Sequence, residues 1–126
     1  MIKRYQIVVT PKGSAGAATA NTTSTAPING VLRGVNVTFA ASSHANTDTT
    51  IATTTAPVTT ILTLTDVNTS AWYYPRHQVH GSTGTALTMD GTRTLVEPLL
   101  IDDYVKVTVA EGTEDKTVTV TLLLET

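Results

Sequence analysis

Two stretches near the end of the chain decide its fold: Val105-Lys106-Val107-Thr108-Val109-Ala110 and, after a short loop, Val118-Thr119-Val120-Thr121-Leu122. Apolar residues alternate with Thr or Lys in both stretches. A period of two residues is that of a β-strand, in which successive side chains point to opposite faces of the sheet. We therefore predict strands over Tyr104–Ala110 and Thr117–Leu124, joined by the loop Glu111–Asp115. The residues expected to face one core are Val105, Val107, Val109, Val118, Val120, Leu122 and Leu124.

The composition of the whole chain favours the same structure. Its 126 residues include 28 Thr, 14 Val and 6 Ile, the three β-branched types. Branching at Cβ restricts the side-chain rotamers, which suits a pleated sheet better than a helix. The length suits one domain, and a hydrophobic content of 40% is that of a globular protein. We predict a single all-β domain over residues 1–126.

The same alternation recurs upstream, separated by turn signals. Further strands are predicted over Ile2–Val9, Val31–Phe39, Thr49–Thr53 and Val58–Thr65, and in a hairpin in which Thr85–Met89 and Thr92–Val96 flank the turn Asp90-Gly91. No segment has the period of an amphipathic helix. Eight or nine short antiparallel strands with frequent turns predict a β-sandwich or jelly-roll-like domain.

Two segments depart from this simple pattern. Residues 11–27 consist almost wholly of Gly, Ala, Ser, Thr and Asn, so we predict an arm or long loop there that becomes ordered when it binds a partner. In the strand Val31–Phe39, the alternation places Arg33 between Val31 and Val35 on the apolar face and Leu32 on the opposite face. We expect Arg33 near the edge of the core and count it among the candidate interface residues.

Charge and cysteine content exclude several classes of function. The chain has 8 Lys and Arg against 10 Asp and Glu, a net charge of −2, which disfavours nucleic-acid binding. It has no cysteine, so a disulfide framework and a cysteine metal site are excluded. We find no signal peptide and no apolar stretch of membrane-spanning length, and we expect neither a membrane partner nor a cofactor.

No residue pattern indicates catalysis or metal binding. His77 and His80 are three residues apart, so a straight strand would send them to opposite faces, and His44 lies in a distant loop. The acidic residues Asp102, Asp103, Glu111, Glu114 and Asp115 lack the spacing of a calcium loop, and we interpret them as charged turns. No strained Gly-x-Ser-x-Gly turn is present. We expect no catalytic site, no metal site and no enzyme activity.

The aromatic run Trp72-Tyr73-Tyr74-Pro75-Arg76 is the most informative candidate for binding. Tryptophan, tyrosine and arginine are the residue types most enriched at energetically important interface positions. Alternation along a strand would place Trp72 and Tyr74 on one face and Tyr73 on the other, so that one set fills the core and the other lies on the surface. The candidate interface residues are Trp72, Tyr73, Tyr74, Arg76 and Arg33.

The weakly charged strands indicate a component of an assembly. Only 14% of the residues are charged, and Thr fills many of the polar positions of the strands. Charged side chains normally protect the free edges of a sheet against pairing with another chain. A protein without that protection is either covered by neighbours or tolerates being covered, so we expect it to form a homo-oligomer or to bind other subunits.

Scaffold motifs are spread along nearly the whole chain: Pro27-Ile28-Asn29-Gly30, Thr47-Asp48-Thr49-Thr50-Ile51, Ile61-Leu62-Thr63-Leu64, Asn68-Thr69, Tyr74-Pro75-Arg76 and the two closing strands. Together they resemble a group of small structural proteins of tailed bacteriophages. They carry no chemistry, and no functional residue is transferred from the group.

The resemblance implies a virion structural protein, made in the host cytoplasm and located on the capsid surface. We expect a decoration, or cement, protein that binds the major capsid protein and stabilises the assembled shell. Two alternatives stay open: a neck or tail component, and a carbohydrate- or receptor-binding module that uses Trp72, Tyr73 and Tyr74 as a stacking platform.

Overall fold

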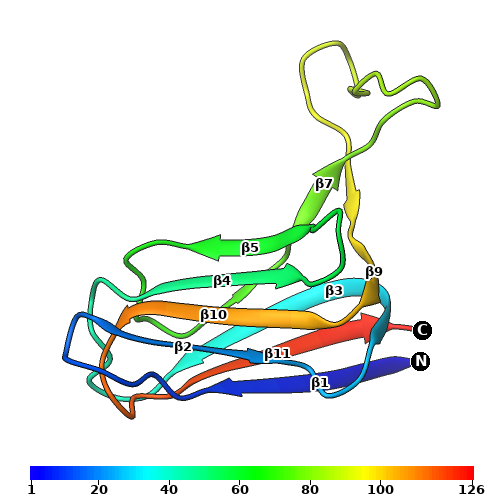
Figure 1. The fold of residues 1–126 in the computed structure, drawn as a ribbon. Coiled ribbons are helices and arrows are strands. Elements are labelled where there is room, and N and C mark those ends of the chain that lie inside the picture. Colours follow the sequence, from blue (N-terminus) through cyan, green and yellow to red (C-terminus); the bar gives the residue numbers. More distant parts are fainter.

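The computed structural model describes residues 1–126 and consists of strands and loops without any helix (Figure 1). The predicted all-β class is therefore confirmed. The first sheet has the order β1 (Ile2–Val9), β11 (Val118–Glu125), β3 (Ile28–Phe39) and β6 (Ala71–Tyr73), and β9 (Leu100–Asp103) pairs with the other end of β3. The second sheet has the order β2 (Ala18–Thr23), β10 (Val105–Gly112), β4 (Asp48–Thr53) and β5 (Thr60–Leu64).

The two sheets enclose one hydrophobic core, as expected of a sandwich. The two strands that the alternation predicted most clearly, β10 and β11, lie in different sheets. The loop between them therefore crosses from one layer to the other, and the two rows of apolar residues face each other. All of these predicted core residues are at most 1% exposed: Val105, Val107, Val109, Val118, Val120, Leu122 and Leu124.

The predicted orientation of Leu32 and Arg33 is wrong, because β3 contains a β-bulge. Leu123 pairs with Gly34 and Leu124 with Leu32, so Arg33 is the additional residue of the bulge. An additional residue changes the side to which the following side chains point. As a result Leu32 is fully buried, in the same core as Val35, instead of on the opposite face as predicted, and Arg33 is exposed.

The segment over residues 11–27, predicted as an arm or long loop, contains a strand. Ala18–Thr23 forms β2, an edge strand that pairs with Lys106–Gly112 of β10. Small side chains do not prevent strand pairing, because the ladder is made by backbone groups. The alternation is present here too, with Ala18 buried and Ala20 partly buried between exposed neighbours, but alanine gives too weak an apolar signal for a prediction.

The segment that does project from the sandwich lies elsewhere, between β6 and β9 (Figure 1). We call residues 76–98 the arm: its base is formed by β7 (Arg76–Gln78) and β8 (Val96–Pro98). The predicted hairpin strands around Asp90-Gly91 are joined by a single bridge, Thr88 to Thr94, rather than by a continuous ladder. No residue from Thr65 to Leu100 is buried.

The tip of the arm is held by one carboxylate. Asp90 accepts hydrogen bonds from the backbone N–H of Arg93, from the Arg93 guanidinium and from the backbone N–H and hydroxyl of Thr92. These bonds, with the Arg93 amide first, lower the pKa of Asp90 to about 2. The turn that the Asp-Gly pair predicted is thus closed by local side-chain contacts and not by packing.

Candidate functional site

The outer faces of the two sheets differ in chemistry. Four large apolar residues in the strands of the sandwich are exposed, namely Ile2, Val8, Trp72 and Leu100, and all four belong to the first sheet. The strands of the second sheet expose no large apolar residue. Their outward positions carry mostly Thr, Asn and Ala, with one cation, Lys106, and the acidic Asp48 at the end of β4. A solvated sheet face normally resembles that of the second sheet, so the first sheet is the exception.

We call the outward side of the first sheet the aromatic face. The strand register shows which residues are neighbours on this face. Arg4 of β1 pairs with Leu123 of β11, and Leu123 pairs with Gly34 of β3. Trp72 of β6 pairs with Asn36 of β3. Its principal side chains are Ile2, Arg4, Val8, Arg33, Trp72, Tyr74, Leu100 and Leu123. It thus combines aromatic, aliphatic and guanidinium groups, the types that contribute most to binding energy at interfaces.

Gly34 has no side chain, which leaves room for the two aromatic rings of Trp72 and Tyr74 against β3. A Cβ atom built at Gly34 would lie 3.3 Å from Cε1 of Tyr74 and 3.6 Å from Cε3 of Trp72. Both rings therefore rest against the backbone of β3, while 62% of Tyr74 and 41% of Trp72 stay exposed. Rings held in this way present a large contact area with little rotamer entropy left to lose on binding.

The structure separates the five candidate interface residues. Trp72, Tyr74 and Arg33 lie on the aromatic face. Tyr73 points to the other side of β6 and packs against the core, so the alternation of the aromatic run places one set inside and one outside. Arg76 lies at the base of the arm, where its guanidinium donates to the carbonyl oxygen of Pro75 at 2.8 Å.

The aromatic face carries charges of both signs: Arg4 and Arg33 are cationic, and Glu125 and Asp102, which shares the outward side of β9 with Leu100, are anionic. The Arg33 guanidinium forms a hydrogen bond and an ion pair with the Glu125 carboxylate, and about half of each side chain is exposed. Such a pair contributes about 0–1 kcal/mol to stability, because water screens it. Arg4 is exposed and has no carboxylate within ion-pair distance. The face can therefore accept a carboxylate from a partner without losing a contact of its own.

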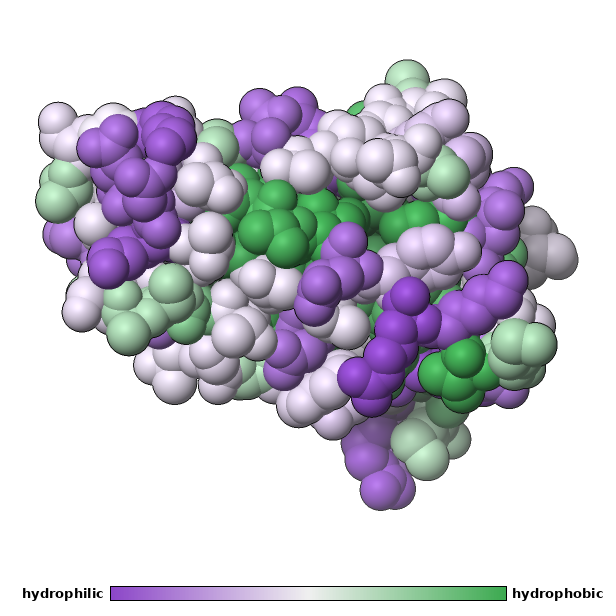
Figure 2. Space-filling model, turned by 90° about the horizontal axis from the view of Figure 1, so that it is seen from below, coloured by the Kyte–Doolittle hydropathy of each residue, from purple (hydrophilic) through white to green (hydrophobic).

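Apolar surface continues around the edge strand β1. Figure 2 views the molecule from the side on which β1 and β2 lie in Figure 1 and shows apolar residues in the middle of this side, bordered by polar ones. A shallow hollow of about 130 Å³ opens between β1 and the segment after β2, with Tyr5, Ile7 and Ile28 among its lining residues. It is too small for a typical small-molecule ligand, which occupies a pocket of about 300–1,000 Å³.

Three carboxylates meet at the far end of the second sheet, a cluster that the sequence did not indicate. Ligand oxygens of Asp48, Asp66 and Glu111 all lie within 4.8 Å of one another. The hydrogen bond to the Asp48 carboxylate, followed by the charge of Asp48, raises the pKa of Glu111, because ionising Glu111 would bring two negative charges together. The three residues come from β4, the turn after β5 and the end of β10, so no sequence spacing could reveal them.

This acidic cluster provides few ligands for a cation. Carboxylate oxygens suit Ca²⁺, but Ca²⁺ takes six to eight oxygen ligands. The chain brings three carboxylates together, and one of them, Asp48, also accepts the backbone N–H of Asp66 at 2.9 Å. The prediction of charged turns holds only for Glu114 and Asp115. Asp102 and Asp103 lie in β9, and Glu111 lies in β10, where a φ of 54° accompanies an irregularity of the ladder with β2.

The histidines do not converge on one site. His77 Nε2 lies 3.0 Å from Glu97 Oε1 across the base of the arm, and His80 Nδ1 lies 2.7 Å from the carbonyl oxygen of Gln78. His44 lies near Gly16, in a loop on the sandwich. None of the three histidines hydrogen-bonds to a serine hydroxyl, so the arrangement offers no activated nucleophile.

No protein-family model matches the chain, and neither a curated protein nor a solved structure is detectably similar to it. The structure contains no helix that is long and apolar enough to cross a membrane.

Proposed function

We propose that this chain is a structural protein of a tailed-bacteriophage virion, and specifically a decoration protein that binds the major capsid protein and stabilises the assembled shell. The observation that carries the proposal is the difference between the two outer faces of the sandwich. One is polar, as a solvated sheet should be, and the other exposes Trp72, Tyr74 and Leu100 together with Arg4 and Arg33. An apolar surface of this kind in an otherwise ordinary domain indicates a surface for protein contact.

In the proposed mechanism, the protein stabilises the shell by contacting several copies of the same capsid subunit. A capsid presents the same subunit surface many times, so a decoration protein that contacts two neighbouring subunits gains from the effective concentration of the second contact. The aromatic face offers a rigid contact surface, and the arm, which leaves the same sheet between β6 and β9, extends the reach of the domain. Binding across a junction between subunits would oppose their separation and thereby stabilise the shell.

Binding to particles tests the proposal. We expect Trp72→Ala and Tyr74→Ala each to weaken binding to undecorated capsids by about 10- to 30-fold, as is typical of interface hot spots. Lys106→Ala, on the outer face of the second sheet, is the matched control and should bind like the wild-type protein. Co-sedimentation with capsids measures the occupancy, and electron microscopy locates the bound protein. Equal losses for Lys106→Ala and Trp72→Ala would contradict the assignment of the aromatic face.

The copy number per particle distinguishes the shell from the neck or tail. Hundreds of copies are expected of a decoration protein, whereas a dozen or fewer would favour the neck or tail tip. In either position the protein would remain a structural component, with the aromatic face as its contact surface.

A carbohydrate- or receptor-binding module is the second candidate function, favoured by the two exposed rings over Gly34. Stacking of a sugar ring on Trp72 would require the same residues. A glycan array separates the two functions, because a decoration protein gives no hits while a glycan-binding module gives hits that Trp72→Ala abolishes.

A further inference from the structure

The edge strands of the two sheets differ in how readily they can accept another strand. β1 carries Lys3 and Arg4, and such charges normally protect an edge. On β2 the backbone of Thr19 already pairs with that of Lys12. β6 and β9 are only three and four residues long. β5 combines a free edge with an uncharged sequence, since residues 58–65 contain no charged side chain and β4 is its only partner strand.

The hydrogen-bond pattern shows which backbone groups of β5 are free. In an antiparallel ladder, alternate residues direct their N–H and C=O to the same side of the strand. The Thr53 N–H donates to the carbonyl oxygen of Thr59 at 3.0 Å, so the odd-numbered residues of β4 bond toward β5. Ile51 is one of them and pairs with Leu62. The next residue, Thr63, therefore directs its N–H and C=O away from β4, where no other group bonds them.

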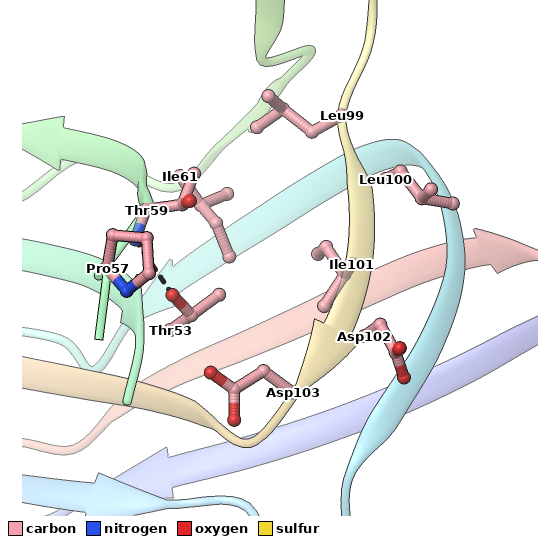
Figure 3. Close-up of a pocket in the computed structure, with 9 residues that line it drawn as sticks. All are labelled: Thr53, Pro57, Thr59, Ile61, Leu99, Leu100, Ile101, Asp102 and Asp103. Carbon is pink, nitrogen blue, oxygen red and sulfur yellow. Dashed lines mark hydrogen bonds between the residues drawn. The ribbon is translucent and has the colours of Figure 1, made fainter. Parts of the chain in front are cut away.

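The first sheet does not cover this edge. A hollow of about 170 Å³ lies between β5 and β9, with Ile61 of β5 and Ile101 of β9 among its lining residues (Figure 3). Polar residues such as Thr53 and Asp103 line it as well, and it is smaller than the roughly 300 Å³ of a small-molecule pocket. The hollow therefore does not indicate a ligand. It shows that β9 stands apart from β5.

The sequence of β5 is compatible with pairing to a second copy of itself. In an antiparallel pair about a two-fold axis at Thr63, each Thr63 would stand opposite its counterpart. Leu62 would then stand opposite Leu64, and Asp66, the first charged residue after β5, opposite Thr60. No like charges would meet, and the leucines would pair on the inner side of the sheet. Leu62, which is partly exposed in the single chain, would become covered.

The arm leaves room for such a neighbour. In Figure 1 it leaves the sandwich toward the end of the molecule at which β5 begins. Thr63 lies near the other end of β5, which spans Thr60–Leu64. A pairing centred on Thr63 therefore displaces the two copies away from each other's arms.

We infer that two copies of this chain associate through β5, antiparallel about a two-fold axis at Thr63, so that their two four-stranded sheets join into one. Such an interface is isologous, the commonest kind in homo-oligomers. Cross-strand neighbours point to the same side of a sheet, so the two aromatic faces of the dimer would point in one direction. The dimer itself does not depend on the proposed function. If that function holds, the dimer would contact two shell subunits at once.

Sedimentation of the isolated protein tests the inference. The strand pair should bury less than the roughly 1,200 Å² of a standard interface, so we expect a reversible dimer with a Kd of about 10–100 µM. Thr63→Lys and Thr63→Glu should each weaken association at least about ten-fold, because like charges would stand opposite each other. An equimolar mixture of the two variants should restore it. Thr108→Lys, on the same outer face but in the middle of the sheet, should associate like the wild-type protein.

Three outcomes would overturn the inference: a wild-type protein that stays monomeric at about ten times the expected Kd, normal association of Thr63→Lys, and a mixture of the charged variants that fails to associate. Weakening by Trp72→Ala but not by Thr63→Lys would place self-association on the aromatic face instead. Circular dichroism of each variant verifies that its fold is retained. Because no capsid is present, none of these results bears on the proposed function.

Cysteine cross-linking tests the register directly, since the chain has no cysteine of its own. Directly opposite residues of a hydrogen-bonded antiparallel pair have Cα atoms about 5.5 Å apart, a separation that a disulfide can span. Thr63→Cys should therefore form a covalent dimer under mild oxidation, and Thr108→Cys, equally exposed on the same face, should not. Equal cross-linking of both variants, or none of Thr63→Cys, would contradict the pairing at Thr63.

Discussion

At the scale of single residues, Gly30 and Gly34 show how two glycines of one strand meet different constraints. Gly30 has a φ of 142°, and a Cβ atom there would lie 2.9 Å from the backbone oxygen of Glu125. A side chain at this position would force the backbone of β3 away from β11. At Gly34 the atoms nearest a Cβ are those of the exposed Tyr74 ring, which can move.

Alanine substitutions should therefore affect stability at Gly30 and binding at Gly34. We expect Gly30→Ala to lower the free energy of unfolding by about 1–3 kcal/mol, the usual range for a strained backbone position. Gly34→Ala should change it by less than about 1 kcal/mol, because alanine is the better strand residue. It should nevertheless displace Tyr74 and weaken capsid binding. Chemical denaturation measures the first effect and co-sedimentation the second; equal stability losses would contradict this account of β3.

The carboxylate cluster at Glu111 predicts a dependence of stability on pH. Because the folded protein raises the pKa of Glu111, this residue contributes favourably to folding below its unfolded pKa of about 4.5 and loses that contribution as the pH rises through the folded value. Glu111→Gln removes the repulsion. We expect it to raise the melting temperature at pH 7 and to have little effect at pH 4.

The control for this comparison is Glu114→Gln, which makes the same change in net charge outside the cluster. Its melting temperature should follow that of the wild-type protein at both values of pH. A stabilisation by Glu111→Gln that is equally large at pH 4 and pH 7 would show that ionisation of Glu111 is not the cause.

At the scale of elements, the arm and the sandwich behave as separate units. The base of the arm is a pair of short strands, in which Arg76 pairs with Pro98, and no residue from Thr65 to Leu100 belongs to the buried core. A two-stranded ribbon of this kind has little stability of its own in water. Exposed apolar residues along it, among them Leu87, Met89 and Val96, offer further contact surface for the proposed binding to capsids.

Replacement of residues 77–97 by a two-residue Asn-Gly turn tests this independence. The two ends, Arg76 and Pro98, are already strand partners, so a tight turn can join them. We expect the free energy of unfolding to change by no more than about 1 kcal/mol, since no buried contact is lost. Binding to capsids should weaken. A protein that fails to fold without the arm would show that the arm is part of the folding unit.

At the scale of the whole molecule, consecutive residues of one strand lie alternately in the core and on the surface. Leu122 of β11 is fully buried, while Leu123 points outward, pairs with Gly34 and is partly exposed. The alternation of the strand thus divides one run of leucines between two tasks: packing the sandwich and forming the aromatic face.

Substitution of each leucine by alanine should separate these tasks. Leu122→Ala is expected to lower the free energy of unfolding by about 2–5 kcal/mol, because it leaves a cavity in the core. Leu123→Ala should cost about 1 kcal/mol or less and should instead weaken binding to capsids. Urea denaturation and co-sedimentation give the two readouts; a larger loss of stability for Leu123→Ala would contradict the assigned orientation of β11.

The sequence by itself determined the class of fold and most of the core. Val105, Val107 and Val109 alternate with polar residues so regularly that their burial follows from the period of a strand. Such a pattern is local, since it depends only on the geometry of consecutive residues. Where the local signal was weak, as in the alanines of β2, or interrupted, as at the bulge of Arg33, the prediction was incomplete or wrong.

Only the tertiary structure decided which surfaces stand together. Trp72 and Tyr74 rest on Gly34, and Glu111 meets Asp48 and Asp66, through pairings between strands that are distant in the chain. The register between strands depends on bulges, turns and the packing of the two sheets as a whole. Alternation tells which face of a strand a residue occupies, but the neighbour across the ladder is fixed only when the complete fold has formed.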